Sequence, residues 1–324
     1  MAMTLTQLKA FIAVARLGSV KAAAESLEVT EPAVSGAVAA LRRELGDPLF
    51  VRGAGGIALT AGGRRLAVGA AEIVGLAEET RQRVREAGEG TSYLRVASTE
   101  SGAELVVPAL LEAFTRRQPD VDTATIAVPP AVFPEILLDR RADVAIGPAA
   151  AGDSPTDPVE SIAFLRYQLV VVASPSHPLG ARATVPTGRL PRERWLLGPD
   201  GLDPGTPSGA FLTRYGVEDA SVSIFPSATG ALDAVAAGEG LSVAFLHLVR
   251  DELRRGMFTA VDVPGTPVNG MFYANALRGE RRSQTASALC RFVTTPAATQ
   301  ALLARSVGVP VSHFRPTVHV TLWS

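Results

Sequence analysis

The sequence predicts an α/β protein that carries a small all-α domain at its N-terminus. Short helical patterns with sharp stops fill the first 60 residues, and one uninterrupted helical pattern follows to about residue 88. Strand and helix patterns then alternate through most of the remaining chain. A chain of 324 residues is long enough for two or three domains, each with its own core.

Three short helices are predicted before residue 46. Thr4 can cap the first helix and Gly18 can end it, while Ser19 can cap a second, alanine-rich helix. Thr30 can cap a third helix that has Pro32 in its first turn, where a missing N–H costs little. After the third helix we expect two short strands, at about 49–52 and 57–59, joined by a glycine-rich tip.

The third helix is predicted to have one buried and one exposed side. Its apolar residues recur at helical spacing and form one stripe: Val34, Val38, Leu41 and Leu45. Three polar residues point the other way: Glu31, Ser35 and Arg42. The exposed side is therefore available to a partner.

The long helical pattern from residue 61 to about 88 contains a seam with steps of four and three residues. Its positions are Leu66, Ala70, Ile73, Ala77, Thr80, Val84 and Ala87. Such a seam predicts pairing with another helix. The glycine- and serine-containing stretch 88–92 is predicted to be a hinge.

The rest of the chain is predicted to form two α/β lobes with a largely parallel sheet. The expected strands are 93–99, 122–128, 142–148, 167–174, 194–199, 221–227, 241–246 and 271–277. The expected helices are 106–119, 133–141, 206–215, 229–237 and 282–294. We expect the chain to cross between the lobes near residues 162 and 267. Residues 311–324 alternate enough to be a strand, but no role follows from them.

Composition narrows the classes of function. The net charge is −1 and the isoelectric point is about 6.5, so any surface for nucleic acid must be local. Lysine and arginine outnumber aspartate and glutamate by eight to five within residues 1–66. The single cysteine, Cys290, excludes an internal disulfide and fits a reducing compartment. Neither a signal peptide nor a membrane span is recognisable, so the cytoplasm is the expected location.

No catalytic site, metal site or cofactor is expected. The four histidines have no metal-ligand spacing, and no Gly-x-Ser-x-Gly motif occurs. Residues 53–58, GAGGIA, fit a dinucleotide-binding pattern formally, but the required apolar helix does not follow them. Cys290 lies in an apolar helical pattern, which favours a buried, inert thiol.

Residues 5–66 resemble the winged helix-turn-helix of LysR-type transcriptional regulators. That family's third helix usually reads Ser-Gln-Pro-Ala-Val-Ser-Arg, and residues 30–36 here read TEPAVSG. Further matches are Leu8, Phe11, Gly18-Ser19, Ala22 to Ala24, Leu41, Leu45-Gly46, Leu49-Phe50, Arg52, Leu59-Thr60 and Gly62. The order of later elements, including VAAGEGLSVAFL at 235–246, is similar to the family's effector-binding domain.

The resemblance implies a winged helix-turn-helix in residues 1–60 and a dimerising linker helix in 61–90. Residues 91–324 would form a two-lobed, periplasmic-binding-protein-like effector domain. Its lobe 1 would span about 91–162 and 267–324, and its lobe 2 about 163–266. The implied function is sequence-specific binding of double-stranded promoter DNA by a homodimer or homotetramer that responds to a small effector. The alternative is a small-molecule-binding protein or enzyme built on the same two lobes, since fold does not fix function.

The resemblance also implies which residues contact DNA. They are Ser19, Thr30, Glu31, Pro32, Ser35, Gly36, Arg42 and Arg52. Glu31 stands where the family usually has glutamine, and Gly36 replaces a common arginine. The wing tip GAGG also lacks a cation. Fewer phosphate contacts predict a shallower salt dependence of DNA binding than in a typical relative.

Effector contacts are expected where strands end. Ser98, Thr99, Glu100 and Ser101 follow the first strand, before a helix expected to start near Ala103. Hydroxyls and free N–H groups there suit an anion such as a carboxylate, although ordinary helix capping would use the same residues. Weaker candidates at other strand ends are Pro129, Gly147, Pro148, Thr206 and Ser227.

Overall fold

A computed structural model describes residues 3–53, 56–148, 157–180 and 184–303. The chain divides into two compact units. The first contains residues 1–89 and the short segment 138–141, and the second contains residues 90–137 and 142–324. No helix within the described ranges is long and apolar enough to cross a membrane.

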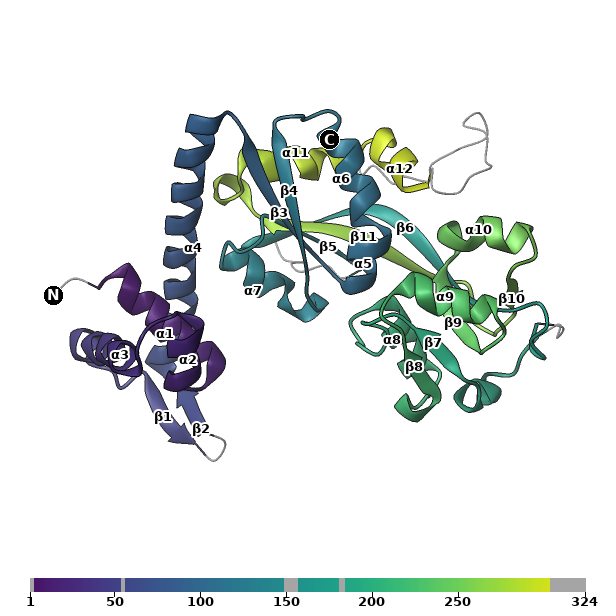
Figure 1. Cartoon of the computed structure of the whole chain (residues 1–324), viewed down its shortest axis with the longest axis horizontal. Helices are drawn as coiled ribbons and strands as arrows, with labels where there is room; N and C mark the ends of the chain where they lie inside the picture. Colours follow the sequence, from purple (N-terminus) through teal and green to yellow (C-terminus); the bar gives the residue numbers. More distant parts are fainter. Residues whose placement is uncertain (1–2, 54–55, 149–156, 181–183, 304–324) are drawn as a thin grey trace. The chain divides into compact units, whose positions relative to one another are not determined.

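The first unit consists of three short helices, a hairpin and one long helix (Figure 1). Its elements are α1 (Leu5–Leu17), α2 (Val20–Ser26), α3 (Glu31–Leu45), β1 (Phe50–Gly53), β2 (Gly56–Leu59) and α4 (Ala61–Glu89). The predicted stops are confirmed: Gly18 and Gly46 end α1 and α3 with φ of +64° and +67°, a conformation that glycine adopts without strain. Thr4 caps α1 through a capping box with Gln7.

The core of this unit lies between α1, α3 and the start of α4. Phe11 is fully buried and packs on Phe50, with ring centroids 5.1 Å apart. Val34, Val38 and Leu41 of α3 are buried as predicted. The prediction was wrong for Leu45, which is 45% exposed. It is the last residue of α3, next to the left-handed turn at Gly46, so it lies past the end of the core.

Asp47 ties the hairpin to α4. Its Oδ1 accepts hydrogen bonds from the N–H of Leu49 at 2.6 Å and from the hydroxyl of Thr60 at 2.7 Å. These bonds, with that of Thr60 the stronger influence, lower the pKa of Asp47 below its usual value. Thr60 Oγ1 in turn accepts from Gly63 N at 2.8 Å. The base of the hairpin and the first turn of α4 therefore share one hydrogen-bond network.

The second unit contains two α/β lobes (Figure 1). Its strands are β3 (Ser92–Ser98), β4 (Val121–Ala127), β5 (Val144–Gly147), β6 (Val159–Ala173), β7 (Trp195–Leu197), β8 (Val222–Ile224), β9 (Leu241–Phe245), β10 (Thr259–Val261) and β11 (Val268–Leu277). Its α-helices are α5 (Glu100–Leu105), α6 (Val107–Thr115), α7 (Phe133–Leu138), α8 (Pro207–Arg214), α9 (Ala228–Ala236), α10 (Leu246–Arg254), α11 (Gln284–Val293) and α12 (Pro296–Leu303).

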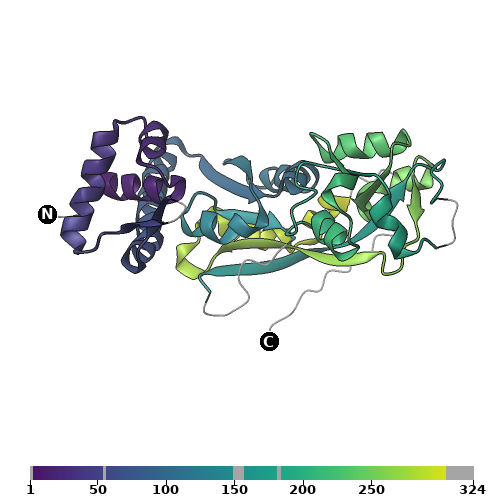
Figure 2. The same ribbon diagram turned by 90° about the horizontal axis from the view of Figure 1, so that it is seen from below.

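The two lobes share the long strands β6 and β11, which run from one lobe into the other (Figure 2). The strand order is β4-β3-β5-β11-β6-β9-β7-β8, and β10 pairs with β6. Pairing is parallel within the lobes, at β3 with β4 and β5 and at β7 with β8 and β9. The prediction of a largely parallel sheet was wrong for the crossing strands, since β6 and β11 pair antiparallel with each other and with their other neighbours. They carry the chain across in opposite directions.

Each lobe has its own apolar core. Phe114 of α6 packs on Phe292 of α11 in lobe 1, with centroids 5.6 Å apart. Trp195 of β7 packs on Phe211 of α8 in lobe 2, at 5.7 Å. The helix predicted over 106–119 is α6, which ends earlier, at Thr115. The strand prediction for residues 311–324 lies outside the described residues.

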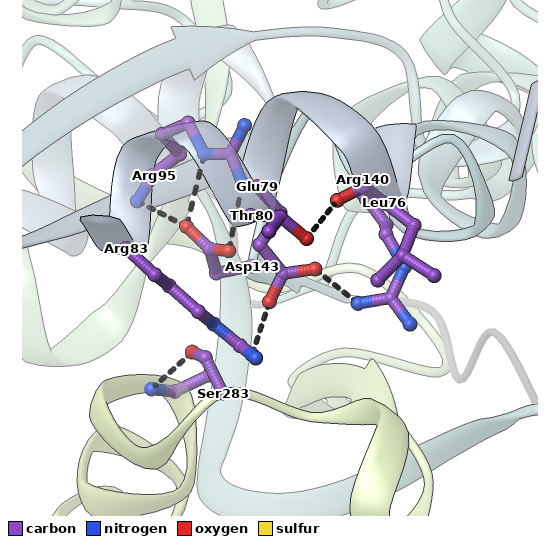
Figure 3. A network of polar contacts seen from close by, with 9 residues as sticks. Leu76, Glu79, Thr80, Arg83, Arg95, Arg140, Asp143 and Ser283 are labelled. Carbon is purple, nitrogen blue, oxygen red and sulfur yellow. Dashed lines mark hydrogen bonds and ion pairs between the residues drawn. The ribbon is translucent and has the colours of Figure 1, made fainter. Parts of the chain in front are cut away.

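Arg95 and Asp143 join β3 to the start of β5 in lobe 1 (Figure 3). Asp143 Oδ2 accepts from the backbone N–H of Arg95 at 2.8 Å and from its Nε at 3.1 Å, while Oδ1 accepts from Nη2 at 2.9 Å. Asp143 N donates to Arg95 O at 2.8 Å. The Asp143 side chain is only 10% exposed, and its loss would remove the acceptor of three hydrogen bonds from Arg95.

We expect Asp143→Ala to lower the free energy of unfolding of the second unit by about 2–3 kcal/mol, because the Asp143 carboxylate is mostly buried and accepts three hydrogen bonds from Arg95. Urea unfolding followed by circular dichroism measures this. Glu112→Ala is the control, since Glu112 pairs with Arg116 on an exposed face, where ion pairs contribute little. Equal midpoints for the two variants would contradict the prediction.

His247 lies in α10 beside Phe245, with ring centroids 5.9 Å apart. Burial, together with the charge of Arg250, lowers its pKa from 6.5 to about 4. The unfolded chain therefore takes up the proton first as pH falls. The neutral form's contribution to stability is complete above about pH 6.5 and is lost as pH falls toward 4.

Between pH 6.5 and 4, we expect the wild type to lose about 2–3 kcal/mol more stability than a His247→Gln variant, since each pKa unit corresponds to about 1.4 kcal/mol. Urea unfolding at both pH values, followed by tryptophan fluorescence, measures the difference. The carboxylates titrate equally in both proteins. Equal losses of stability would therefore show that folding does not lower the pKa of His247.

Candidate DNA interface and interlobe effector site

The exposed side of α3 presents the polar residues predicted for it. Val34 and Val38 are buried in the core, while Glu31, Ser35 and Arg42 are exposed beside this buried stripe. Pro32 lies exposed in the first turn. The guanidinium of Arg42 lies over the Phe50 ring, 5.8 Å from its centroid, and remains open to solvent. This arrangement gives α3 a polar surface supported by a rigid core.

Thr30 occupies the N-cap position of α3, but the predicted side-chain cap was wrong: its hydroxyl makes no capping hydrogen bond. The reason is local. Pro32 has no N–H to donate, and the N–H of Ala33 already bonds to the Thr30 carbonyl at 3.0 Å. Ser19 differs, because its hydroxyl accepts from Ala22 N at 3.3 Å and so caps α2.

Gly36 lies on the exposed side of α3 with open space around it. A Cβ built there would meet no neighbouring heavy atom within 4 Å. A longer side chain therefore fits without displacing the fold. Arg52 lies in β1 opposite Ile57, and its side chain is outside the described part of the structure.

In the second unit, Ser98 and Thr99 are buried, and their hydroxyls form hydrogen bonds within lobe 1. Ser98 Oγ donates to Ile146 O at 2.7 Å and joins β3 to β5. Thr99 caps α5 by accepting from Gly102 N at 3.0 Å. Thus α5 begins at Glu100, and the prediction of a helix start near Ala103 was wrong because Thr99 is the cap. Glu100 is exposed in its first turn.

Ser101 meets lobe 2. Its N–H and hydroxyl both donate to Asp200 Oδ2, at 3.0 and 2.8 Å. Asp200 lies in the loop after β7, and this loop is held by the buried Thr206, whose Oγ1 lies 2.8 Å from Asp203 O and 3.1 Å from Asp200 O. Ser101 and Thr206, two of the predicted residues, are therefore close together at the interlobe site.

Ser227 caps α9 by accepting from Gly230 N at 2.9 Å. The next two N–H groups, those of Ala228 and Thr229, donate to the carboxylate of Glu104 in lobe 1, at 2.7 and 3.0 Å. Sequence reasoning missed Glu104 and Asp200. Their partners lie 124 and 99 residues away, so no local pattern marks them.

Pro129, Gly147 and Pro148 lie at strand ends of lobe 1. Gly147 is covered by Phe133: a Cβ there would lie 2.5 Å from Phe133 Cε2. Pro129 is exposed and precedes the short 3-10 turn Pro130–Val132. Pro148 is partly buried directly after β5. The interlobe hydrogen bonds described above involve Ser101 and Glu104, not these three residues.

Cys290 is 3% exposed in α11, and burial raises the pKa of its thiol. A protonated, buried thiol reacts slowly. Among the described residues, no group of three or more His, Cys, Asp or Glu side chains is placed to hold a metal ion.

A winged helix-turn-helix joined by a long helix to two α/β lobes defines a class of DNA-binding transcriptional regulators. Family models agree with this class: "Bacterial regulatory helix-turn-helix protein, lysR family" matches residues 5–64, and "LysR substrate binding domain" matches residues 87–297. The chain belongs to the LysR family of transcriptional regulators, whose members are not enzymes.

Similarity to known regulators extends over nearly the whole chain. The HTH-type transcriptional regulator Rv0377 of Mycobacterium tuberculosis H37Rv is 38% identical over 99% of this chain and 100% of its own length. CfxR of Cupriavidus necator is 33% identical over 90% of each chain. The solved structure of CbnR, a LysR family transcriptional regulator, is 25% identical, covers 90% of this chain and 98% of its own, and has a TM-score of 0.56.

Proposed function

We propose that this transcriptional regulator binds promoter DNA sequence-specifically through α3 and the β1-β2 wing, and responds to a small molecule bound between its two lobes. The observation that carries the DNA-binding part is the polar, exposed side of α3, backed by a buried apolar stripe. The site residues are those predicted: Ser19, Thr30, Glu31, Pro32, Ser35, Gly36, Arg42 and Arg52. Because the proposed partner is promoter DNA, the proposed location is the cytoplasm.

In this proposal, two hydroxyls and one carboxylate of the α3 region contact the DNA. The Thr30 and Ser35 hydroxyls reach phosphates or base edges, and Thr30 is suited to this because capping does not engage its hydroxyl. Glu31 can only accept hydrogen bonds, so it would read cytosine N4 and repel phosphates. Support for a DNA partner also comes from a solved structure, CbnR complexed with its target DNA, 25% identical with a TM-score of 0.55.

The proposed assembly is a homodimer through α4, or a homotetramer built from such dimers. Two seam positions are used inside the first unit, since Ala70 is fully buried there and Leu66 packs against its core. Farther along α4, the apolar side chains Ile73, Leu76 and Val84 are 44%, 45% and 70% exposed. An exposed apolar stripe on a long helix favours pairing with a second helix.

The proposed effector site is the interlobe region around Ser101 and Thr206, where strand ends of both lobes meet. Ser98, Thr99, Glu100, Pro129, Gly147, Pro148 and Ser227 remain proposed contacts around it. Free N–H groups near Ser101 had suggested a carboxylate effector, but the Ser101 N–H already donates a hydrogen bond to Asp200. A carboxylate effector would therefore have to displace Asp200.

Gel retardation with the DNA upstream of the protein's own coding region tests the proposal. We expect a shift at low salt that excess random DNA does not remove. The alternative, a small-molecule-binding protein on the same two lobes, predicts no shift at any salt concentration. Thermal-shift screening of a metabolite library then tests the effector, because a ligand that binds only the folded state raises the melting temperature.

A further inference from the structure

A carboxylate of each lobe accepts hydrogen bonds from the start of a helix in the other lobe. Asp200 of lobe 2 accepts two hydrogen bonds from Ser101 at the start of α5 in lobe 1. Glu104 of lobe 1 accepts three from the start of α9 in lobe 2: from Ala228 N at 2.7 Å, from Thr229 N at 3.0 Å and from Thr229 Oγ1 at 2.6 Å. Each lobe therefore supplies the acceptor for N–H groups of the other.

These contacts matter because the N–H groups have no acceptor in their own helix. The first N–H groups of a helix lack a carbonyl partner one turn back, and they carry a partial positive charge. Ser227 caps Gly230 N but leaves those of Ala228 and Thr229 to Glu104. When the lobes separate, water must form the hydrogen bonds that both carboxylates and these N–H groups lose.

Charge strengthens the contact. Burial raises the pKa of Glu104, but the hydrogen bonds from Thr229 and Ala228 outweigh it, so the pKa lies below its usual value. The carboxylate is therefore ionised near neutral pH. Hydrogen bonds to an ionised acceptor are stronger than those between neutral groups.

We propose that Glu104 and Asp200 form a reciprocal latch that holds the two lobes together. Its five hydrogen bonds are contacts that an effector must break or reinforce to change the angle between the lobes. Its regulatory meaning rests on the proposed function, but its existence does not.

Hydrogen–deuterium exchange of the full chain, without DNA or effector, tests the latch. In Glu104→Gln, an NH2 group replaces one of the two acceptor oxygens, so we expect the amide of Ala228 or that of Thr229 to exchange about tenfold faster than in the wild type. The amide of Gly230, which depends on Ser227, should not change and serves as a reference inside the same helix. Glu112→Gln, on an exposed face of α6, is the matched control.

Distances between the lobes test the consequence. Spin labels on Gln118→Cys and Arg255→Cys, in a Cys290→Ala background diluted with unlabelled protein, report the separation of lobe 1 and lobe 2. We expect one narrow distribution for the parent and for Glu112→Gln, and a broader or longer one for Glu104→Gln with Asp200→Ala. If that double variant is unfolded by circular dichroism, the single Glu104→Gln variant decides.

An unchanged distance distribution in a folded latch variant, or fast exchange of Ala228 and Thr229 in the wild type, overturns the latch. Neither result depends on DNA binding. Conversely, a wild type that binds no DNA overturns the proposed function while the exchange data still report on the latch.

Discussion

Replacing Val84 by aspartate should separate the proposed dimer into monomers of 33.7 kDa. Val84 is 70% exposed on α4, on the same side as Ile73 and Leu76. If this side pairs with its copy, the substitution buries an unpaired carboxylate from each subunit. We expect the dissociation constant to rise at least about 100-fold, which corresponds to about 3 kcal/mol. Sedimentation velocity over a range of protein concentrations measures it.

The control is Val68→Asp on the same helix. Val68 is 65% exposed. Because it precedes Ile73 by five residues, it lies on another side of α4, outside the apolar stripe. It should leave the assembly unchanged. A Val84→Asp variant that sediments like the wild type would show that subunits, if they associate, do so elsewhere. Because two linked DNA-binding units read paired half-sites, the monomer should also bind its operator more weakly.

Gly36→Arg should strengthen DNA binding and steepen its dependence on salt. Space around Gly36 admits the side chain, and an arginine on the exposed side of α3 can reach a phosphate. One added phosphate contact steepens the slope of log K against log salt by about 0.9 per subunit. We expect operator affinity at low salt to rise about tenfold, measured by fluorescence anisotropy at several salt concentrations.

Gly36→Ala separates the effect of the added charge from the effect on helix stability. Alanine stabilises a helix interior by about 0.5–1 kcal/mol relative to glycine, yet adds no cation. It should raise the stability of the first unit and leave the salt slope unchanged. Equal slopes for the arginine and alanine variants would mean that Gly36 does not face the duplex.

Glu31→Gln should increase affinity for random DNA several-fold, because it removes a negative charge from the same surface. Glu239→Gln, an exposed change of equal charge in lobe 2, is the control. If both variants bind random DNA like the wild type, Glu31 lies away from the phosphates.

Prediction from sequence was most accurate where structure depends on near neighbours. Helix stops at Gly18 and Gly46 and the helix cap at Thr4 were all recognisable, because each involves residues within four positions. Thr30 shows the limit of the same reasoning. This favourable capping residue makes no side-chain cap, because Pro32 has no N–H and the N–H of Ala33 bonds to the Thr30 carbonyl.

The sequence by itself determined the division into a helical DNA-binding unit and two α/β lobes, since helix and strand periodicity and turn residues act locally. Its motif order also determined the family. Only the tertiary structure decided that β6 and β11 cross antiparallel between the lobes, and that Glu104 and Asp200 meet helix starts of the opposite lobe. Those contacts join residues about a hundred positions apart, so they exist only after the sheet has brought the two lobes together.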